Sequence, residues 1–251
     1  MDCAFDGAAS GYADDADLQA AFYSALTLCG ISDYSVEASF KTFSSVKTMA
    51  EISRARKMIL AQVSDAYRLA PREVLMGLAL DACARLFHRK VQGKYVEEFR
   101  RFQKRGSLLR LSDSIRQMRG RKRKDNSAGE FFDLEKIGAE VYGKYSVVLG
   151  MQKMPKVLWN DRGGRRTLAF YDRAFDKVLI SRVFDSPNVP RAVIEYLCFH
   201  EFLHAKHAPL YERGKSMRTI VHSRAFKKDE EKFEGFEEAD GWIERKAGRL
   251  G

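Results

Sequence analysis

The chain has 251 residues, with 44 lysines and arginines against 34 acidic residues and a formal net charge of +10. Its start lacks the basic region and apolar core of a secretory signal, and no apolar run approaches the roughly 18 residues of a membrane span. We therefore expect a soluble, cytoplasmic protein with no membrane partner. Four scattered cysteines agree with a reducing compartment.

The N-terminal segment is acidic. Residues 1–40 contain seven acidic residues and no lysine or arginine, a charge of −7, so the remainder of the chain carries +17. Residues 1–13 are small and polar and are expected to be mobile, whereas Asp17–Leu28 has the spacing of a short amphipathic helix. We predict an acidic, partly disordered segment over residues 1–35.

Residues 36–118 are predicted to form a mainly helical, basic module. Pro71 opens a segment that reaches Lys90, in which apolar residues recur at helical spacing. Gly93–Lys104 predicts a second helix, with aromatic residues at spacings of four and three. His88 lies in the first of these helices, and we interpret it as structural.

Positive charge is concentrated in residues 89–124, which contain fourteen lysines and arginines against three acidic residues. Such a density is typical of a nucleic-acid-binding surface, because contacts to phosphates need no sequence motif. The alternatives are a solvated face and an intramolecular partner for the acidic segment. Residues 119–129 contain a run with no apolar residue to bury and are predicted to be a basic linker between two domains.

The second domain, residues 130–251, is predicted to combine helices with a small sheet. Asp133 can start a helix, and three short runs rich in branched and aromatic residues follow it. These runs, Lys156–Trp159, Thr167–Tyr171 and Val178–Ser181, are predicted to be strands joined by turns. The chain as a whole is therefore expected to be an α+β protein.

A buried helix is predicted over residues 189–207. Asn188 can cap its start, Pro190 suits its first turn and Pro209 prevents much continuation. The residues that follow Val193 are apolar nearly all round, which is typical of a helix inside a core rather than on a surface.

The sequence HEFLH, residues 200–204, lies in the second half of this helix. His200 and His204 are at positions i and i+4, so they project from one face and can bind one metal ion. Two inert core histidines are the alternative. Burying both imidazoles and the Glu201 carboxylate without a metal would leave three polar groups to satisfy, at about 1 to 3 kcal/mol for each unmet one. We predict one Zn²⁺ ion here.

A catalytic zinc site normally has three protein ligands and one open position. His222 is the predicted third ligand, because the chain can turn back after the first helix and begin a second helix near this residue. His207 is about 10 Å from His200 along the helix axis and is expected to flank the site instead. Glu230 and Glu231 are rival ligands.

The predicted chemistry is hydrolysis of a peptide bond through a zinc-bound water. Zinc lowers the pKa of bound water towards about 7, and Glu201 can accept the proton and pass it to the leaving amine. The residue that stabilises the developing negative charge stays open among Tyr211, Arg213 and His207. An edge strand of the predicted sheet can bind an extended substrate by main-chain pairing, which predicts loose specificity, although the strands also serve to complete the core.

The order and spacing of several segments resemble the SprT-like zinc metallopeptidases, a zincin family related to the protease domain of Spartan. The similarity covers roughly residues 130–245, and it is carried by Leu168–Asp172, Val178–Ser181, the run HEFLHAKH that begins at His200, and His222–Phe226. This resemblance implies that His200, His204 and His222 are metal ligands, that Glu201 is the catalytic base, and that the fold is zincin-like, with a small twisted sheet beside the active-site helix. Relatives of Spartan often carry further zinc-binding modules, but without a C-x-x-C pair none is expected here.

The best-known members of this family act at DNA, so the resemblance implies that the basic residues 89–124 contact DNA. The leading hypothesis is a zinc-dependent metalloendopeptidase that acts on protein or peptide substrates, among them DNA-associated proteins. The competing hypothesis is a basic nucleic-acid-binding protein with a structural or inactive zinc site. Glu201 discriminates between them, because a purely structural site needs no carboxylate beside an open coordination position. The sequence does not indicate an oligomeric state.

Overall fold

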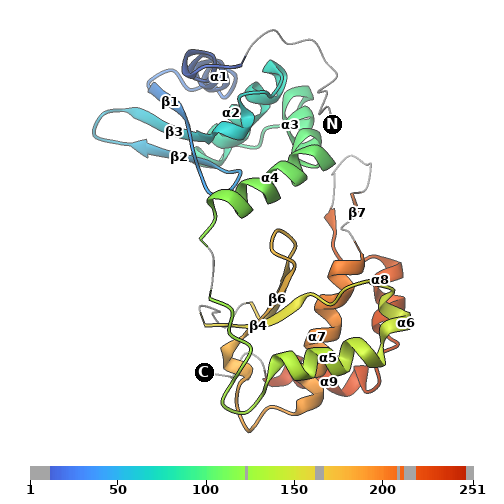
Figure 1. Ribbon diagram of the computed structural model, residues 1–251. Helices are drawn as coiled ribbons and strands as arrows, with labels where there is room; N and C mark the ends of the chain where they lie inside the picture. The colour runs from blue at the N-terminus through green and yellow to red at the C-terminus, as the bar shows by residue number, and fades with distance from the viewer. Residues whose placement is uncertain (1–11, 122–123, 162–166, 208–209, 212–218, 247–251) are drawn as a thin grey trace. The chain divides into compact units, whose positions relative to one another are not determined.

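The computed structural model describes residues 12–121, 124–161, 167–207, 210–211 and 219–246. Residues 1–13, which were predicted to be mobile, lie almost wholly outside the described residues. The chain forms two compact units, residues 1–121 and 122–251, and each combines helices with a three-stranded mixed sheet (Figure 1). The α+β prediction is confirmed. Among the helices described, none is long and apolar enough to cross a membrane.

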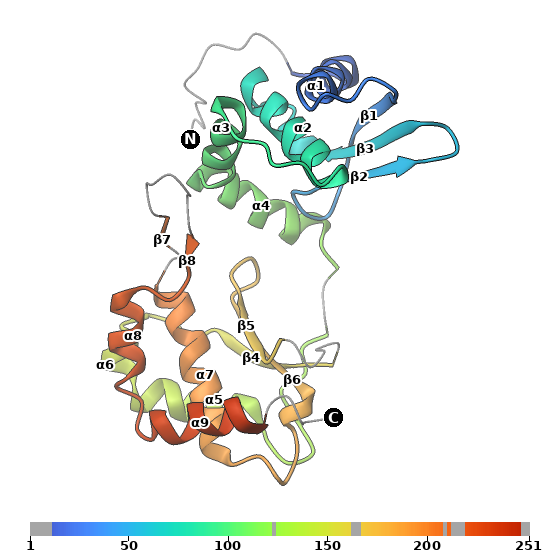
Figure 2. The same ribbon diagram turned by 180° about the vertical axis from the view of Figure 1, so that it is seen from behind.

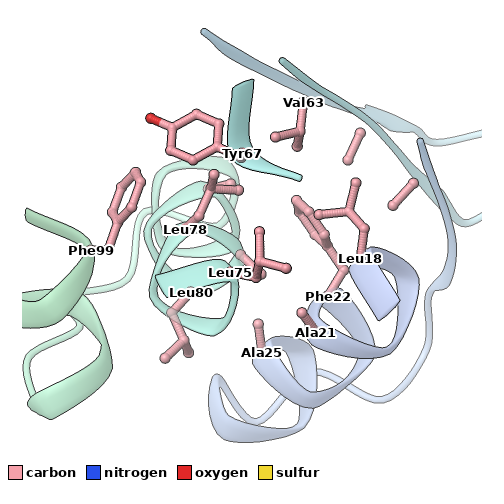
Figure 3. Packing of buried hydrophobic residues seen from close by; sticks show 14 of the residues in the cluster. Leu18, Ala21, Phe22, Ala25, Val63, Tyr67, Leu75, Leu78, Leu80 and Phe99 are labelled. Atoms are coloured by element: carbon pink, nitrogen blue, oxygen red, sulfur yellow. The ribbon is translucent and has the colours of Figure 1, made fainter. Parts of the chain in front are cut away.

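The first unit packs a sheet against helices. Its elements are α1 (Asp15–Leu28), β1 (Ser35–Lys41), β2 (Thr48–Ser53), β3 (Met58–Ser64), α2 (Arg72–Leu86), α3 (Lys94–Gln103) and α4 (Gly106–Arg119). Strand β3 lies between β1, to which it is parallel, and β2, to which it is antiparallel. The core forms where Leu18 and Phe22 of α1 and Leu75 and Leu78 of α2 meet Val63 of β3 (Figure 3).

The prediction of a mainly helical module over residues 36–118 is wrong for its first part, because residues 35–64 contain three strands. Every second residue is buried in Val36–Phe40 and in Ile59–Val63, and this period of two is the pattern of a half-buried strand. The segment 1–35 is not a separate element either, since α1 lies where its helix was predicted but belongs to the core of this unit.

Helices α2 and α3 correspond to the two predicted helices and cross at Gly77. A Cβ at this position would lie 2.0 Å from the backbone oxygen of Tyr95, so only glycine permits the approach. Helix α2 ends at Leu86 rather than at Lys90, because His88 adopts a left-handed backbone conformation with φ of 52°. The side chain of His88 is exposed, and it does not lie inside a helix.

The second unit surrounds one long helix with a sheet and shorter helices. Its elements are α5 (Leu134–Lys144), α6 (Ser146–Leu149), β4 (Lys156–Asn160), β5 (Ala169–Asp172), β6 (Lys177–Ser181), α7 (Arg191–Lys206), β7 (Leu210–Tyr211), β8 (Thr219–Ile220), α8 (Arg224–Glu230) and α9 (Phe236–Lys246). The three predicted strands are β4, β5 and β6, in the order β4-β6-β5. Strand β5 pairs antiparallel with β6 and forms an edge of this sheet (Figure 2).

Helix α7 is the centre of this unit and contacts α5, α6, β5, β6, α8 and α9. Its buried residues lie on nearly all sides, namely Val193, Ile194, Tyr196, Leu197, Cys198, Phe199, Glu201, Phe202 and Leu203. The helix starts at Arg191 with Pro190 in the N-cap position, not Asn188 as predicted, because Asn188 lies in the preceding turn, where its N–H donates to the Ser186 hydroxyl. The apolar pattern thus predicted the burial of α7 correctly, and the helix starts two positions after the predicted start.

The end of the predicted linker 119–129 leads into a loop that belongs to the second unit. Asp185, whose side chain is 4% exposed, accepts hydrogen bonds from the three backbone N–H groups of residues 130–132 and from Arg182. Gly129 fits beside this carboxylate because a Cβ there would lie 2.4 Å from Oδ1 of Asp185. One buried carboxylate therefore fixes the backbone of residues 130–132, near the start of the second unit.

Asp185→Asn is expected to lower the free energy of unfolding by about 1 to 3 kcal/mol at pH 7. Burial opposes ionisation, but the three N–H groups and Arg182 outweigh it and hold the pKa of Asp185 below its ordinary value of 3.8. Because the folded pKa is lowered, this stabilisation is present above the pKa of the unfolded chain and is lost as the pH falls through the folded value. Urea unfolding should show that the difference in the free energy of unfolding between variant and wild type is smaller at pH 3 than at pH 7.

The matched control is Asp161→Asn. Asp161 pairs with the same Arg182 at 3.0 Å but is exposed and receives no comparable set of backbone bonds among the described residues. Its loss is expected to cost less than about 1 kcal/mol. Equal destabilisation of the two variants would contradict the role given to the backbone N–H groups.

Candidate metal centre

Three histidines converge at the C-terminal half of α7 and the start of α8. His200, His204 and His222 each offer one ring nitrogen, and these atoms all lie within 4.8 Å of one another. Nε2 of His204 lies 3.2 Å from Nε2 of His222. The structure thus brings together the three residues that were predicted as ligands, although eighteen positions separate His204 from His222.

The elements explain why these rings meet. His200 and His204 are one turn apart on α7, and their ring centroids are 4.9 Å apart. His222 precedes Ser223, whose hydroxyl accepts the N–H of Phe226 and caps α8. The fully buried Phe226 ring packs against all three histidines, with centroid distances between 4.6 and 5.2 Å. An apolar residue therefore supports the cluster.

The electrostatic state of the cluster suits a cation. Burial and the neighbouring histidines lower the pKa of His204 to about 4, and burial and His200 also lower the pKa of His222. Both rings are therefore neutral at pH 7 and present a nitrogen lone pair. Three imidazoles with nitrogens this close are a donor set that Zn²⁺ accepts.

Glu201 is the buried carboxylate beside the histidines, only 4% exposed. Desolvation raises its pKa to about 7, although His200 and the backbone N–H of Tyr171 act in the opposite direction. Its Oε2 atom is buried and has no hydrogen-bond partner among the residues that the structure describes. Buried carboxylate oxygens are nearly always hydrogen-bonded, so this atom fits a site whose remaining partner is a ligand.

Glu230 and Glu231, the rival ligands, lie outside the three-histidine group. Oε1 of Glu230 lies 2.6 Å from Nδ1 of His200 and accepts the hydroxyl of Tyr196 at 2.9 Å. Burial opposes its ionisation, but the His200 and Tyr196 contacts outweigh it and lower the pKa of Glu230. Glu231 is exposed. The rival prediction therefore receives no support from the geometry.

His207 flanks the cluster, as predicted from its distance from His200 along the helix axis. Its Nε2 lies 2.9 Å from Oδ2 of Asp229, a carboxylate that also accepts Lys206 and Lys232 at 2.6 Å. Burial opposes the effect of these three partners, which together hold the pKa of Asp229 well below its usual range. The ring of His207 thus contacts Asp229 and helps to connect the end of α7 to α8.

The candidates for stabilising negative charge are placed only in part. Tyr211 lies in the short strand β7, and Arg213 lies outside the described residues. The contacts of Glu230 and of the Tyr171 N–H carried no sequence signal, because neither has a characteristic spacing from the HEFLH run. No protein-family model, curated protein or solved structure matches the chain, so the centre is interpreted from its own geometry.

Proposed function

We propose that this protein is a zinc-dependent metalloendopeptidase of the SprT-like, zincin type. His200, His204 and His222 would hold one Zn²⁺ ion, and Glu201 would act as the general base. The observation that carries the proposal is the buried Glu201 carboxylate beside three convergent imidazoles, with one oxygen unpartnered within the described part of the chain. Neither a core histidine cluster nor a purely structural zinc site requires such a carboxylate.

The chemistry of the chain's own groups supports this assignment. When bound, Zn²⁺ supplies Lewis acidity and makes water nucleophilic near neutral pH. Glu201 has a pKa of about 7, which suits a group that must accept a proton from the attacking water and return it to the leaving amine. The N–H of Tyr171 holds this carboxylate from the side of the sheet.

The proposed substrate is an extended polypeptide. Strand β5 forms an edge of its sheet and contacts α7, so the edge that carries Tyr171 lies beside Glu201. Main-chain pairing with such an edge gives affinity with little dependence on side chains. This supports a protease with loose sequence specificity.

Protein purified without added metal is expected to contain about one zinc ion per chain. It should cleave casein, lose the activity when treated with a chelator and regain it when Zn²⁺ is restored. Metal analysis and a gel-based cleavage assay on the same preparation test both points. A folded chain with no metal and intact histidines would restore the interpretation as inert core histidines.

DNA contact through the basic region is the second part of the proposal. The exposed basic residues of α3, α4 and the turn between them include Lys94, Arg100, Arg101, Arg105, Arg110 and Arg119. Among them, Arg101 pairs with acidic neighbours on its own helix and Arg119 pairs with Asp65. Positive charge on the neighbouring helices α3 and α4 favours sequence-independent binding to phosphates. The competing function, a nucleic-acid-binding protein with an inactive zinc site, shares this surface and differs only at Glu201.

DNA binding is expected to weaken steeply as salt rises from about 50 to about 200 mM. The double variant Arg100→Glu/Arg110→Glu should bind more weakly, and the slope of log K against log salt should fall by about 0.9 for each phosphate that is no longer neutralised. Arg54→Glu/Arg56→Glu changes the net charge equally at exposed positions outside this region and serves as the control. Affinity that is independent of salt, or equal weakening in both double variants, would count against binding at α3 and α4.

A further inference from the structure

We infer that Glu230 and Tyr196 act as a positioning pair that orients His200 for metal binding. The pair would hold the ring through Nδ1, so that Nε2 is the nitrogen offered to the ion. This inference rests on the proposed metal site and concerns residues that do not ligate the metal themselves.

The geometry forms a short chain of polar groups. The Tyr196 hydroxyl donates to Oε1 of Glu230 at 2.9 Å, and the same oxygen lies 2.6 Å from Nδ1 of His200. Tyr196 and His200 are one turn apart on α7, whereas Glu230 is the last residue of α8. The side chains of His200 and Glu230 are only 19% and 12% exposed. Both partners are thus held on helices in a largely buried setting.

The chemical consequence follows from the two nitrogens of imidazole. A carboxylate that accepts from Nδ1–H selects the tautomer in which Nε2 carries the lone pair, and it increases the basicity of that nitrogen. The Tyr196 hydroxyl keeps the carboxylate in place and satisfies part of its hydrogen-bonding capacity. Loss of such a partner typically costs about 10-fold to 100-fold in metal affinity.

A purely structural role is the alternative, because Glu230 also joins α8 to α7. The neighbouring Asp229 performs that structural role for His207 and Lys206 without reaching the three-histidine group. Asp229→Asn is therefore a control for weakened anchoring between the two helices. Glu231→Gln, at an exposed neighbouring position, controls for the change of charge.

The test measures Zn²⁺ affinity by competition with a chromophoric chelator, on full-length variants shown to be folded by circular dichroism. Glu230→Gln is expected to weaken binding by about 10-fold to 100-fold, and Tyr196→Phe, which keeps the carboxylate, by a smaller factor. Asp229→Asn and Glu231→Gln should stay close to the wild-type affinity, since neither residue contacts a ligand. Unchanged affinity in Glu230→Gln would overturn the inference.

A second readout needs no metal. Long-range proton–nitrogen correlation spectra of the metal-free chain should show His200 as the Nδ1–H tautomer in the wild type and as a mixture in Glu230→Gln. An Nε2–H tautomer in the wild type would overturn the inference. A wild-type chain that binds no zinc would refute the proposed function as well, whereas zinc binding that is indifferent to Glu230 would refute the positioning pair alone.

Discussion

Glu201→Gln is expected to retain zinc and to lose about 10²-fold to 10⁴-fold in kcat for peptide cleavage. Glutamine has nearly the shape of glutamate and cannot accept a proton at neutral pH, so the exchange removes the proposed general base and leaves His200 and His204 in place. The fold should survive, because the exchange replaces a buried carboxylate whose ionisation is opposed by desolvation with a neutral group. Zinc content and cleavage rate are measured on the same protein.

The matched control for this variant is Glu195→Gln on the same helix. Glu195 is partly exposed and pairs with Arg191 at 2.7 Å, away from the three-histidine group. Its cleavage rate should match the wild type within a small factor. If Glu201→Gln cleaves casein as fast as the wild type in the presence of zinc, Glu201 is not the base and the catalytic proposal fails.

His222→Ala is expected to weaken zinc binding by more than the roughly 100-fold that loss of a supporting partner can cost, because it removes one of the three proposed ligands. His204→Ala should behave in the same way. His207→Ala serves as the control, since its ring contacts Asp229 and lies outside the group of three. Chelator competition and metal analysis give the affinities.

Zinc binding in these variants is expected to depend on which histidine is removed, not on how many histidines remain. His207 is closer to His204 in sequence than His222 is, so a site assembled by local sequence alone would depend on His207. If His207→Ala loses zinc while His222→Ala keeps it, the ion binds elsewhere on α7 and the proposed set of ligands is wrong.

Several features of the second unit were accessible from local patterns. Short runs rich in branched and aromatic residues predicted β4, β5 and β6, and the continuous apolar run predicted a buried helix at α7. Helical spacing put His200 and His204 on one face, because i and i+4 lie together on any α-helix. These inferences need only the backbone geometry of one element at a time.

The first unit shows where local patterns mislead. In residues 35–64, β1 and β3 bury alternate residues, whereas no residue of β2 is buried. Their identity depends on pairing between β1 and β3, two strands that are separated by β2 in sequence. Parallel pairing of this kind depends on contacts distant in sequence, which the pattern of neighbouring residues does not contain.

The sequence by itself determined that one face of a buried helix carries two histidines beside a glutamate, and that His222 is available as a third ligand. The tertiary structure decided that one ring nitrogen of each of the three histidines converges, that Oε2 of Glu201 is buried without a partner among the described residues, and that Glu230 contacts Nδ1 of His200. The reason is that spacing along one helix follows from the repeat of the backbone, whereas contacts between α7, α8 and β5 arise only when their apolar faces pack together.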